Sequence, residues 1–276
     1  MTQIRTATLA ELEHILGWAS DEGWNPGLDD AEAFFKADPH GFFVAVDQTD
    51  KPIASISVVN HSPEFAFLGL YIVKPEFRGQ GIGFALWSQA LKHAGARTVG
   101  LDGVEAQQAN YRSSGFVNAG GTSRYAGTLD GERHDDIRDV APHQVQTLIE
   151  MEARGSGVSK PAYLARWFSQ SPTRSTILRE THGQIRGFAT IRACRSGSKI
   201  GPIVASDSDT ASKLLAHAAT KFDGPLTIDV PDSANELSKI CQKFDFRVGF
   251  RTARMYRGKA PTSRSDLFAV TSLELG

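Results

Sequence analysis

The first 126 residues carry two hydrophobic spacings. Leu9, Leu12, Ile15 and Leu16 recur at intervals of three or four residues, which predicts an amphipathic helix. The runs "GFFVAVD" and "PIASISVV" flank the polar "QTDK", which predicts a hairpin. The other predicted elements of this half are a strand at 4–6, a short helix in "DDAEAFFKADP", a long strand in "EFAFLGLYIV", a helix in "FALWSQALKHAG", a strand in "RTVGLDGV", a short helix in "QQANYRSSG" and one or two strands in "FVNAGGTSRYAG".

A similar order of elements returns in the second half. A hairpin is predicted at 175–180 and 184–193, "KIGPIVA" stands where "LGLYIVK" stood, and "GPLTIDV" stands where "RTVGLDG" stood. Helices predicted in "DTASKLLAHAATKF" and "NELSKICQKFDF" follow the same order, "RTARMYRG" matches "TSRYAG", and "LFAVTSLELG" is predicted as a final strand. We therefore predict an α+β fold (α/β/α) in two copies, residues 1–127 and 128–276, each with a mixed, mostly antiparallel sheet flanked by helices.

Composition and charge narrow the classes of function. The 276 residues are 41% hydrophobic, and the net charge of -1 gives no field that would recruit nucleic acid or an anionic membrane. No apolar stretch reaches the roughly 20 residues of a membrane span, and the N-terminus lacks the features of a signal peptide. Two cysteines, and histidines without metal-ligand spacing, predict neither a disulfide scaffold nor a metal site. We expect a cytoplasmic protein that binds neither nucleic acid nor membrane.

The stretch "VKPEFRGQGIGFAL" places three glycines at alternate positions between a predicted strand and a predicted helix. A dinucleotide-binding turn would need its third glycine at Phe84, and "KPEFR" separates the strand from the first glycine, although Asp102 lies where a ribose-binding acid would be expected. A nucleoside-triphosphate loop would need a lysine and a hydroxyl after the glycines, and both are missing. These departures count against a dinucleotide-binding turn and exclude a nucleoside-triphosphate loop.

A pyrophosphate site fits the same stretch better. Gly79, Gly81 and Gly83 let successive amides point into one concavity without obstruction from a Cβ atom. The loop opens a predicted helix, whose free amides and partial positive charge favour an anion. Arg78 adds a charge with bidentate geometry for phosphate oxygens.

The motif V-x-P-x-x-R-G-x-G-I-G resembles the acyl-CoA motif of the GNAT N-acetyltransferase superfamily, and the order of elements over residues 1 to about 126 is similar as well. The resemblance implies an acetyl-CoA-dependent transferase that acts on a primary amine of a small molecule or a peptide. The alternative is a non-catalytic protein that binds or senses acyl-CoA. The implied cofactor-binding residues are Leu70, Tyr71, Ile72 and Val73 along the strand, and Arg78, Gly79, Gln80, Gly81, Ile82 and Gly83 in the loop.

The resemblance also implies catalytic positions. Tyr111, four residues before the "GF" dipeptide, corresponds to the general acid that protonates the departing thiolate. Glu64, at the start of the long strand, is the predicted base, with His61 as a neighbour of similar standing. Asn110 is a further predicted cofactor contact. In the family, the connection between the first two helices forms much of the acceptor pocket, which assigns Trp24 and Asn25 to the substrate.

The second copy lacks this machinery. Its equivalent loop, "VASDSDTASK", has no arginine and no glycine run, and Asp207 and Asp209 would cap a helix but repel a pyrophosphate. Cys241 stands at the position of the tyrosine. We therefore predict that the second copy keeps the fold without the cofactor. The stretches "GWNPG", "GLDGV", "RMYRG" and "ELG" resemble bacterial tandem GNAT proteins, and we expect a monomer or a homodimer.

Overall fold

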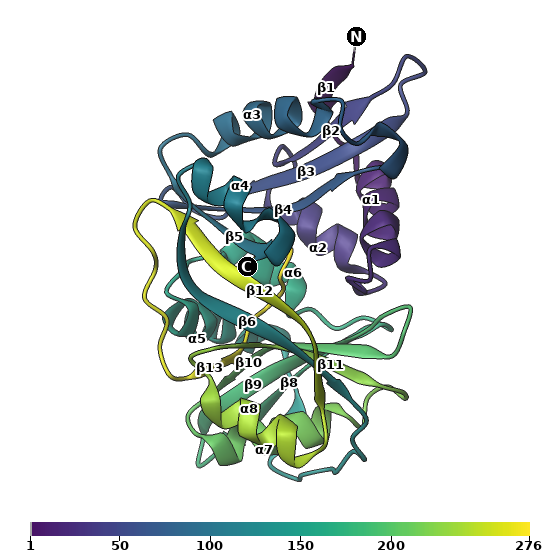
Figure 1. Ribbon diagram of the computed structural model, residues 1–276. Helices are drawn as coiled ribbons and strands as arrows, with labels where there is room; N and C mark the ends of the chain where they lie inside the picture. The colour runs from purple at the N-terminus through teal and green to yellow at the C-terminus, as the bar shows by residue number, and fades with distance from the viewer. Residues whose placement is uncertain (1) are drawn as a thin grey trace.

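A computed structural model describes residues 2–276 and shows one continuous sheet that runs through both halves of the chain (Figure 1). The strand order is β1-β2-β3-β4-β5-β12-β6-β11-β10-β9-β8-β7, and β13 pairs with β10. The first half contains β1 (Gln3–Thr6), α1 (Leu9–Asp21), α2 (Asp30–Ala37), β2 (Phe42–Val46), β3 (Pro52–Asn60), β4 (Phe65–Val73), α3 (Ile82–Ala94), β5 (Thr98–Val104), α4 (Gln108–Ser113) and β6 (Val117–Gly127). The second half contains β7 (Ile137–Asp139), α5 (Val145–Ser156), α6 (Pro161–Trp167), β8 (Arg174–Thr181), β9 (Gln184–Ala193), β10 (Ser198–Ala205), α7 (Ser208–Ala218), β11 (Leu226–Pro231), α8 (Asn235–Lys243), β12 (Arg247–Arg257) and β13 (Leu267–Ala269).

Local sequence explains the first layer of this fold. Thr8 and Glu11 form a capping box at the start of α1, so two orphan backbone groups of the helix are satisfied. Along β2, Phe42 and Val44 belong to the core under α1 and α2, whereas Phe43 and Ala45 belong to the core under α3. The period-two alternation of this strand therefore separates the helical layers on the two faces of the sheet.

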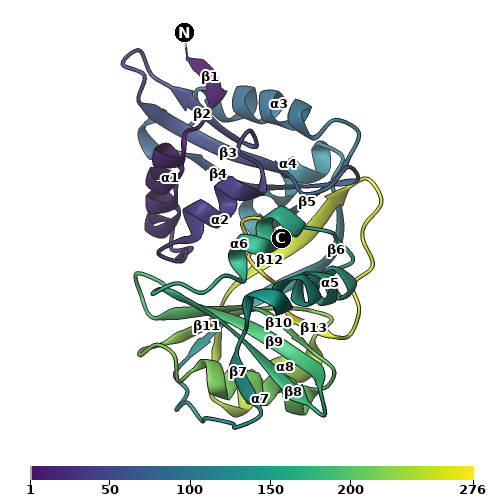
Figure 2. The same cartoon turned by 180° about the vertical axis from the view of Figure 1, so that it is seen from behind.

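The last long strands of the two halves are exchanged. β12 lies between β5 and β6, so a strand of the second half pairs with the sheet of the first. β6 in turn pairs with β11 of the second half. Figures 1 and 2 show these two long strands crossing from one half of the molecule to the other. The predicted boundary at 127/128 remains a prediction, but the hydrogen-bonded sheet does not end there.

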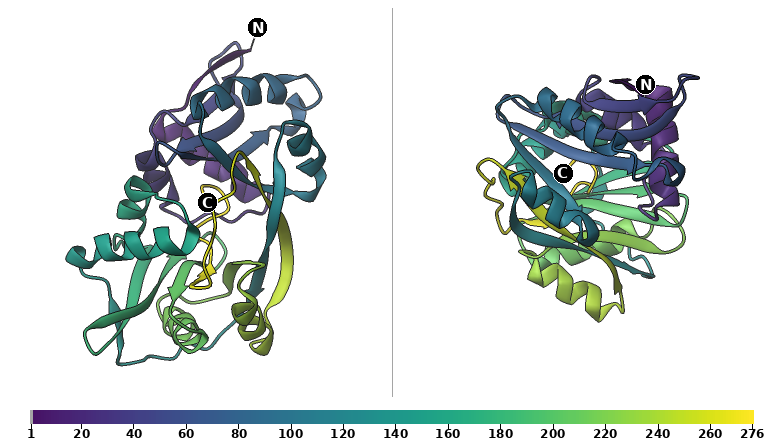
Figure 3. Two further views of the ribbon diagram at one scale, coloured as in Figure 1. Left: turned by 90° about the vertical axis from the view of Figure 1, so that its left-hand side faces the viewer. Right: turned by 45° about the horizontal axis from the view of Figure 1, so that its top comes forward.

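Helices from both halves also share one core. Phe34 on α2 stacks on Trp167 of α6 at 6.0 Å between ring centroids, and Tyr163 packs against both rings. This core joins α1, α2, α5 and α6. The C-terminus lies between the two halves (Figure 3). The halves are therefore held together by packing as well as by strands.

The predicted α+β architecture and the repeat are confirmed. Each half has one parallel strand pair, β4 with β5 and β10 with β11, among antiparallel pairs. The structure also contains β7, α5 and α6, which the sequence analysis does not predict, and the final strand is limited to Leu267–Ala269, after which the chain bends. No helix within residues 2–276 is long and apolar enough to cross a membrane.

Candidate functional site

The sheet opens between β4 and β5. Their parallel ladder runs from Phe65 paired with Thr98 to Leu68 paired with Leu101 and then stops. Beyond this point β4 continues to pair with β3, and β5 with β12, so the two facing edges carry backbone groups without a strand partner. A channel of about 520 Å³ lies at this opening and is lined by Tyr71, Ile72 and Val73 from β4.

The glycine loop (residues 79–83) lies beside this channel, since Tyr71, Val73 and Arg78 line both the channel and the hollow formed by the glycines. Gly79 and Gly81 have φ angles of 76° and 78°, which glycine adopts without steric cost. Gly83 has a different role: a Cβ atom there would lie 2.6 Å from the Tyr71 hydroxyl, so glycine allows β4 and α3 to approach. All three glycines are therefore required by the local geometry, for two different reasons.

The amides of this loop have no partner within the protein. Within residues 2–276, no backbone or side-chain group accepts a hydrogen bond from the amides of residues 79–84, and the helix α3 begins at Ile82 with no side-chain cap. Arg78 stands beside them. Its Nε donates to the Val73 carbonyl at 2.8 Å and its Nη2 to Glu22 at 2.7 Å, with the Arg78 side chain 52% exposed. A run of free amides at a helix N-terminus next to an exposed guanidinium can bind an anion such as a pyrophosphate.

A second, inner pocket of about 90 Å³ adjoins the channel. Tyr71 and Trp24 line both, and Tyr111 lines the inner pocket. The Tyr111 ring stacks on Trp87 at 5.5 Å, and Gly103 leaves room for it, since a Cβ there would lie 2.9 Å from the ring. The structure thus brings Tyr111 close to the strand residues predicted to bind the cofactor.

Tyr111 keeps its proton. Burial, and to a lesser extent Tyr71, raise the pKa of Tyr111 to about 12. No group within residues 2–276 forms a hydrogen bond with its hydroxyl. The hydroxyl is therefore neutral at physiological pH and available as a donor toward a group in the pocket.

The connection between α1 and α2 is anchored to the second half. The Trp24 carbonyl accepts hydrogen bonds from Arg124 at 3.0 Å and from Lys199 at 2.9 Å. The Asn25 side chain donates to the Ser196 carbonyl at 2.8 Å, which uses its amide outside both pockets. Trp24 therefore faces the pockets, whereas Asn25 binds the neighbouring loop.

Behind this connection lies a buried ion network. Asp30, 0% exposed, accepts from Arg192 at 3.1 Å and from Arg174 at 2.8 Å, and both guanidiniums lie about 4.4 Å or less from the centre of the Trp167 ring. Burial alone would raise the pKa of Asp29, but Arg174 and the Ser171 hydroxyl outweigh it, so the pKa of Asp29 is lowered. These acids fix the α1–α2 connection and are not free to attract a cationic substrate.

Three other predicted residues lie away from the inner pocket. Glu64 is exposed before β4, at the end opposite the opening, and is bonded by Ser62 at 3.0 Å. Asn110 is exposed on α4 and donates to Gln107 at 2.8 Å. His61 is buried, and its Nε2–H donates to the Leu275 carbonyl at 2.8 Å; burial, then Lys160, lower its pKa to about 3. The geometry brings none of the three to Tyr111.

The C-terminal tail enters the point where the ladder of the first half ends. A Cβ at Gly69 would lie 2.0 Å from the Glu274 carbonyl oxygen. The equivalent Gly201 in the second half meets the Val270 carbonyl oxygen in the same way, at 2.4 Å. The chain thus passes both equivalent points in succession. Glu274 and Leu273 line the inner pocket.

The opening of the second half is already filled. β10 pairs with β11 only over Ser198 to Ile200, and β13 then pairs antiparallel with β10 at Ile203 and Val204. Asp207 caps α7 by accepting from the Thr210 amide at 2.8 Å, as predicted. Cys241 occupies the place of Tyr111, since the amide of Phe246 bonds to its carbonyl as Phe116 bonds to Tyr111.

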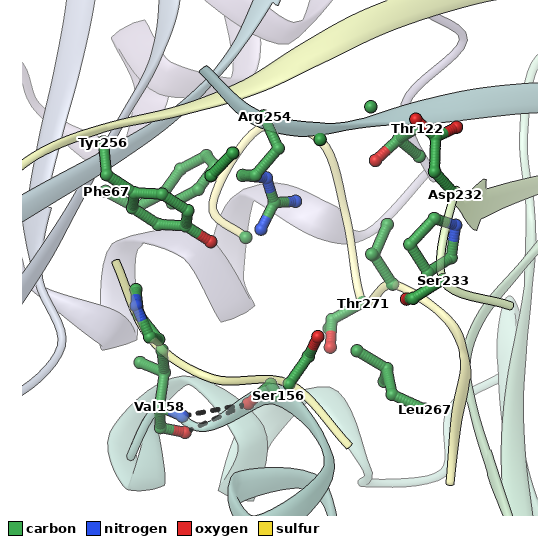
Figure 4. A pocket seen from close by; sticks show the side chains of 18 of the residues that line it. Phe67, Thr122, Ser156, Val158, Asp232, Ser233, Arg254, Tyr256, Leu267 and Thr271 are labelled. Atoms are coloured by element: carbon green, nitrogen blue, oxygen red, sulfur yellow. Dashed lines mark hydrogen bonds between the residues drawn. The ribbon is translucent and has the colours of Figure 1, made fainter. Parts of the chain in front are cut away.

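A separate pocket of about 180 Å³ lies between α5, the tail and the crossing strands (Figure 4). Its charged side chains have partners: Arg254 pairs with Asp102, Lys160 with Glu152, and Asp232 with Arg251. Arg254 separates this pocket from the inner pocket, where Asp102 lies. With its charges already paired, this pocket offers a ligand no free charged side chain, whereas the glycine loop offers backbone amides without a partner.

Several residues of the inner pocket had not been predicted as site residues, among them Arg124, Phe250, Leu273 and Glu274. They come from β6, from β12 and from the tail, so only the tertiary structure gathers them. One local signal was present: Gly69 interrupts a strand pattern, which is typical of a close backbone approach.

Comparison with known proteins agrees with this geometry. Residues 9–118 match the model of the acetyltransferase (GNAT) family, and residues 148–269 match an acetyltransferase (GNAT) domain. A holothin acyltransferase of Pseudoalteromonas sp. (strain SANK 73390) is 34% identical over 99% of this chain and 94% of its own. The uncharacterized N-acetyltransferase YitH of Bacillus subtilis (strain 168) is 25% identical over 76% of each chain.

Solved structures show the same fold. A crystal structure from Pyrococcus horikoshii superposes with a TM-score of 0.83 at 20% identity and covers 100% of this chain and 96% of its own. A tandem GNAT protein from the clavulanic acid biosynthesis pathway has a TM-score of 0.63 at 13% identity and covers 96% and 100%. The chain belongs to the GNAT acetyltransferase family, carries two GNAT domains in tandem, and is an acyltransferase.

Proposed function

We propose that this protein transfers an acetyl group from acetyl-CoA to a primary amine of a small molecule. One observation carries the proposal: the free amides of residues 79–84 lie at one end of the opened strand edge, and Tyr111 lies in the pocket at the other end. GNAT acyltransferases take their acyl group from acyl-CoA, whose thioester is the activated donor. Trp24 and Tyr71 line both the channel beside the anion site and the pocket that holds the proton donor, so the two sites adjoin.

The residues of these two sites have distinct roles in the proposal. Arg78 and the loop amides bind the pyrophosphate, and the open edge of residues 70–73 pairs with the amide-bearing arm of the donor. The carbonyl that reacts then lies in the inner pocket. Tyr111, neutral because its pKa is about 12, gives its proton to the departing sulfur.

A small acceptor fits the shape of the inner pocket better than a peptide does. The pocket measures about 90 Å³ and is walled by Trp24, Tyr71 and Phe250. The relative named holothin acyltransferase makes holothin the first acceptor to test. In the second half β13 pairs where a donor arm would bind, which supports one donor site per chain.

The test follows free thiol release from acetyl-CoA in a panel of primary amines that includes holothin. Wild type should release thiol with at least one amine, and Tyr111→Phe should lower kcat by roughly 10²-fold or more while acetyl-CoA binding is kept. Binding of acetyl-CoA without any turnover would instead favour the non-catalytic alternative. Unchanged kcat in Tyr111→Phe would contradict the role of Tyr111.

A further inference from the structure

The inner pocket contains a carboxylate to which no group within residues 2–276 donates a hydrogen bond. Glu274 lines the pocket and is only 3% exposed, and its Oε2 is buried without a partner. An ionised carboxylate that has lost water and gained no donor is energetically costly. A ligand that brings a donor into the pocket would remove this cost.

The other acids around the pocket are already paired. Arg254 donates to Asp102 through two nitrogens, at 3.0 and 2.7 Å. Arg124 donates to Asp229 through two nitrogens, at 2.7 and 2.9 Å. Glu274 is therefore the carboxylate in the described pocket that remains open to a cation from outside the protein.

The tail holds Glu274 in a fixed position. On one side Gly69 contacts its carbonyl oxygen, and on the other the Leu275 carbonyl accepts from His61 at 2.8 Å. Lys160 donates to Gly276 at 2.5 Å and also pairs with Glu152 at 2.8 Å. These contacts place the carboxylate where the β4–β5 ladder ends, in the inner pocket.

Several charged groups of the packed elements face Glu274. Three cations from the sheet interact electrostatically with its charge, namely Arg124 on β6, Arg192 on β9 and Lys199 on β10. Asp102 lines the same pocket and is paired with Arg254. Arg124 and Arg192 have their own acids, and the Lys199 ammonium bonds to the Trp24 carbonyl. None of these three cations donates a hydrogen bond to the Glu274 carboxylate, so it remains available to a donor that a ligand brings.

We propose that Glu274 binds the ammonium group of the acceptor and takes one of its protons during turnover, so that the tail of the second half completes the pocket of the first. The inference rests on the proposed function, which assigns Tyr111 as the general acid, and adds Glu274 as the general base. The Glu274 carboxylate gains a proton from the ammonium, and the freed nitrogen lone pair forms a bond to the thioester carbonyl carbon. The carbon–sulfur bond breaks and its electron pair stays on sulfur. Sulfur takes the Tyr111 proton, Tyr111 recovers a proton from the nitrogen, and Glu274 releases its proton to water.

Two measurements test this assignment. The first compares the thermal stabilisation by benzylamine with that by benzyl alcohol, an uncharged analogue, in the presence of CoA. Wild type should be stabilised more by the amine, and Glu274→Gln should lose that preference. The second measures kcat and KM between pH 7 and 10 for an amine that the wild-type protein acylates. The variant should lose about 10²-fold or more in kcat/KM at pH 7, and the loss should shrink toward pH 10 as more amine is neutral.

Controls separate chemistry from folding. Glu236→Gln, an exposed acid on α8, should match wild type in both measurements. Glu274→Asp keeps the charge and should retain the preference for the amine with intermediate turnover, even if Glu274→Gln is unstable. An acid that only balances buried cations would lower the melting temperature and leave kcat/KM unchanged.

The outcomes are distinct. Equal stabilisation by amine and alcohol in wild type, or kcat/KM of Glu274→Gln within twofold of wild type across the pH range, would overturn the proposal. A preference for the amine that depends on Glu274, in a protein that acylates no amine, would reject the proposed function and leave the ammonium site standing.

Discussion

Arg78 Nη2 lies 2.7 Å from Glu22 Oε1, which ties the cation of the glycine loop to the residue that follows α1. Both side chains line the channel, and both are about half exposed. The same guanidinium is the charge that a pyrophosphate would use. In the proposed complex, Glu22 would therefore compete with the donor for Arg78.

Glu22→Gln should strengthen acetyl-CoA binding. An exposed ion pair is worth about 0.2–1 kcal/mol, so its loss should lower Kd by roughly 1.4- to 5-fold, and by less at high salt. Isothermal titration at two salt concentrations measures this. Glu13→Gln, exposed on α1 and outside the channel, serves as the control. Weaker binding in Glu22→Gln would mean that Glu22 positions Arg78 and does not compete for it.

Gly81→Ala should weaken both stability and donor binding. A Cβ at this position meets nothing within 4 Å, so the cost comes from the φ angle of 78° alone and should be about 1–2 kcal/mol. Denaturant unfolding and titration with acetyl-CoA measure the two effects. Gly249→Ala is the matched control, since that glycine is equally uncrowded and lacks a positive φ. Equal effects in both variants would show that the left-handed turn is not needed.

The buried His61 should make the fold acid-sensitive. Its pKa is about 3 in the folded chain against 6.5 ordinarily, so the unfolded chain binds the proton first as the pH falls. The stability that depends on neutral His61 is complete above pH 6.5 and is lost progressively toward pH 3. His61→Gln keeps a donor for the Leu275 carbonyl and should flatten this loss in urea unfolding measured at several pH values. His40→Gln, on an exposed residue, should follow wild type.

Asp30→Ala should destabilise the whole molecule. The substitution leaves Arg192 and Arg174 buried without this carboxylate, which typically costs about 3–5 kcal/mol. Urea unfolding measures the change in free energy. Asp139→Ala removes an acid that is 58% exposed and paired with Lys221, and should change stability by less than about 1 kcal/mol. A similar small change in Asp30→Ala would show that the Trp167 ring alone accommodates both arginines.

The anion-binding chemistry of the glycine loop could be predicted from the local sequence. The turn at Gly79 and Gly81 depends on residues that are near one another in the chain, and so does the short helix that carries Tyr111. Residue propensities and motif spacing predict such local features. The repeat was accessible for the same reason, because each half presents its elements in the same order.

The strand exchange and the position of Glu274 in the inner pocket could not be predicted from the sequence. β12 pairs with β5 and β6 although it lies in the other half of the sequence, so no local pattern specifies this pairing. Glu274 meets Gly69 from the opposite end of the chain, and nothing in its neighbours marks that contact. Long-range packing decided both features.

The position of β12 has a consequence for synthesis of the chain on the ribosome. The edge of β5 that β12 covers stays bare until residues 247–257 have emerged, and the inner pocket lacks one wall until Leu273 and Glu274 have emerged. The amino-terminal half therefore cannot assemble the complete inner pocket ahead of the carboxy-terminal half. A gene split at the midpoint would have to deliver both products together, since each holds a strand that the other needs.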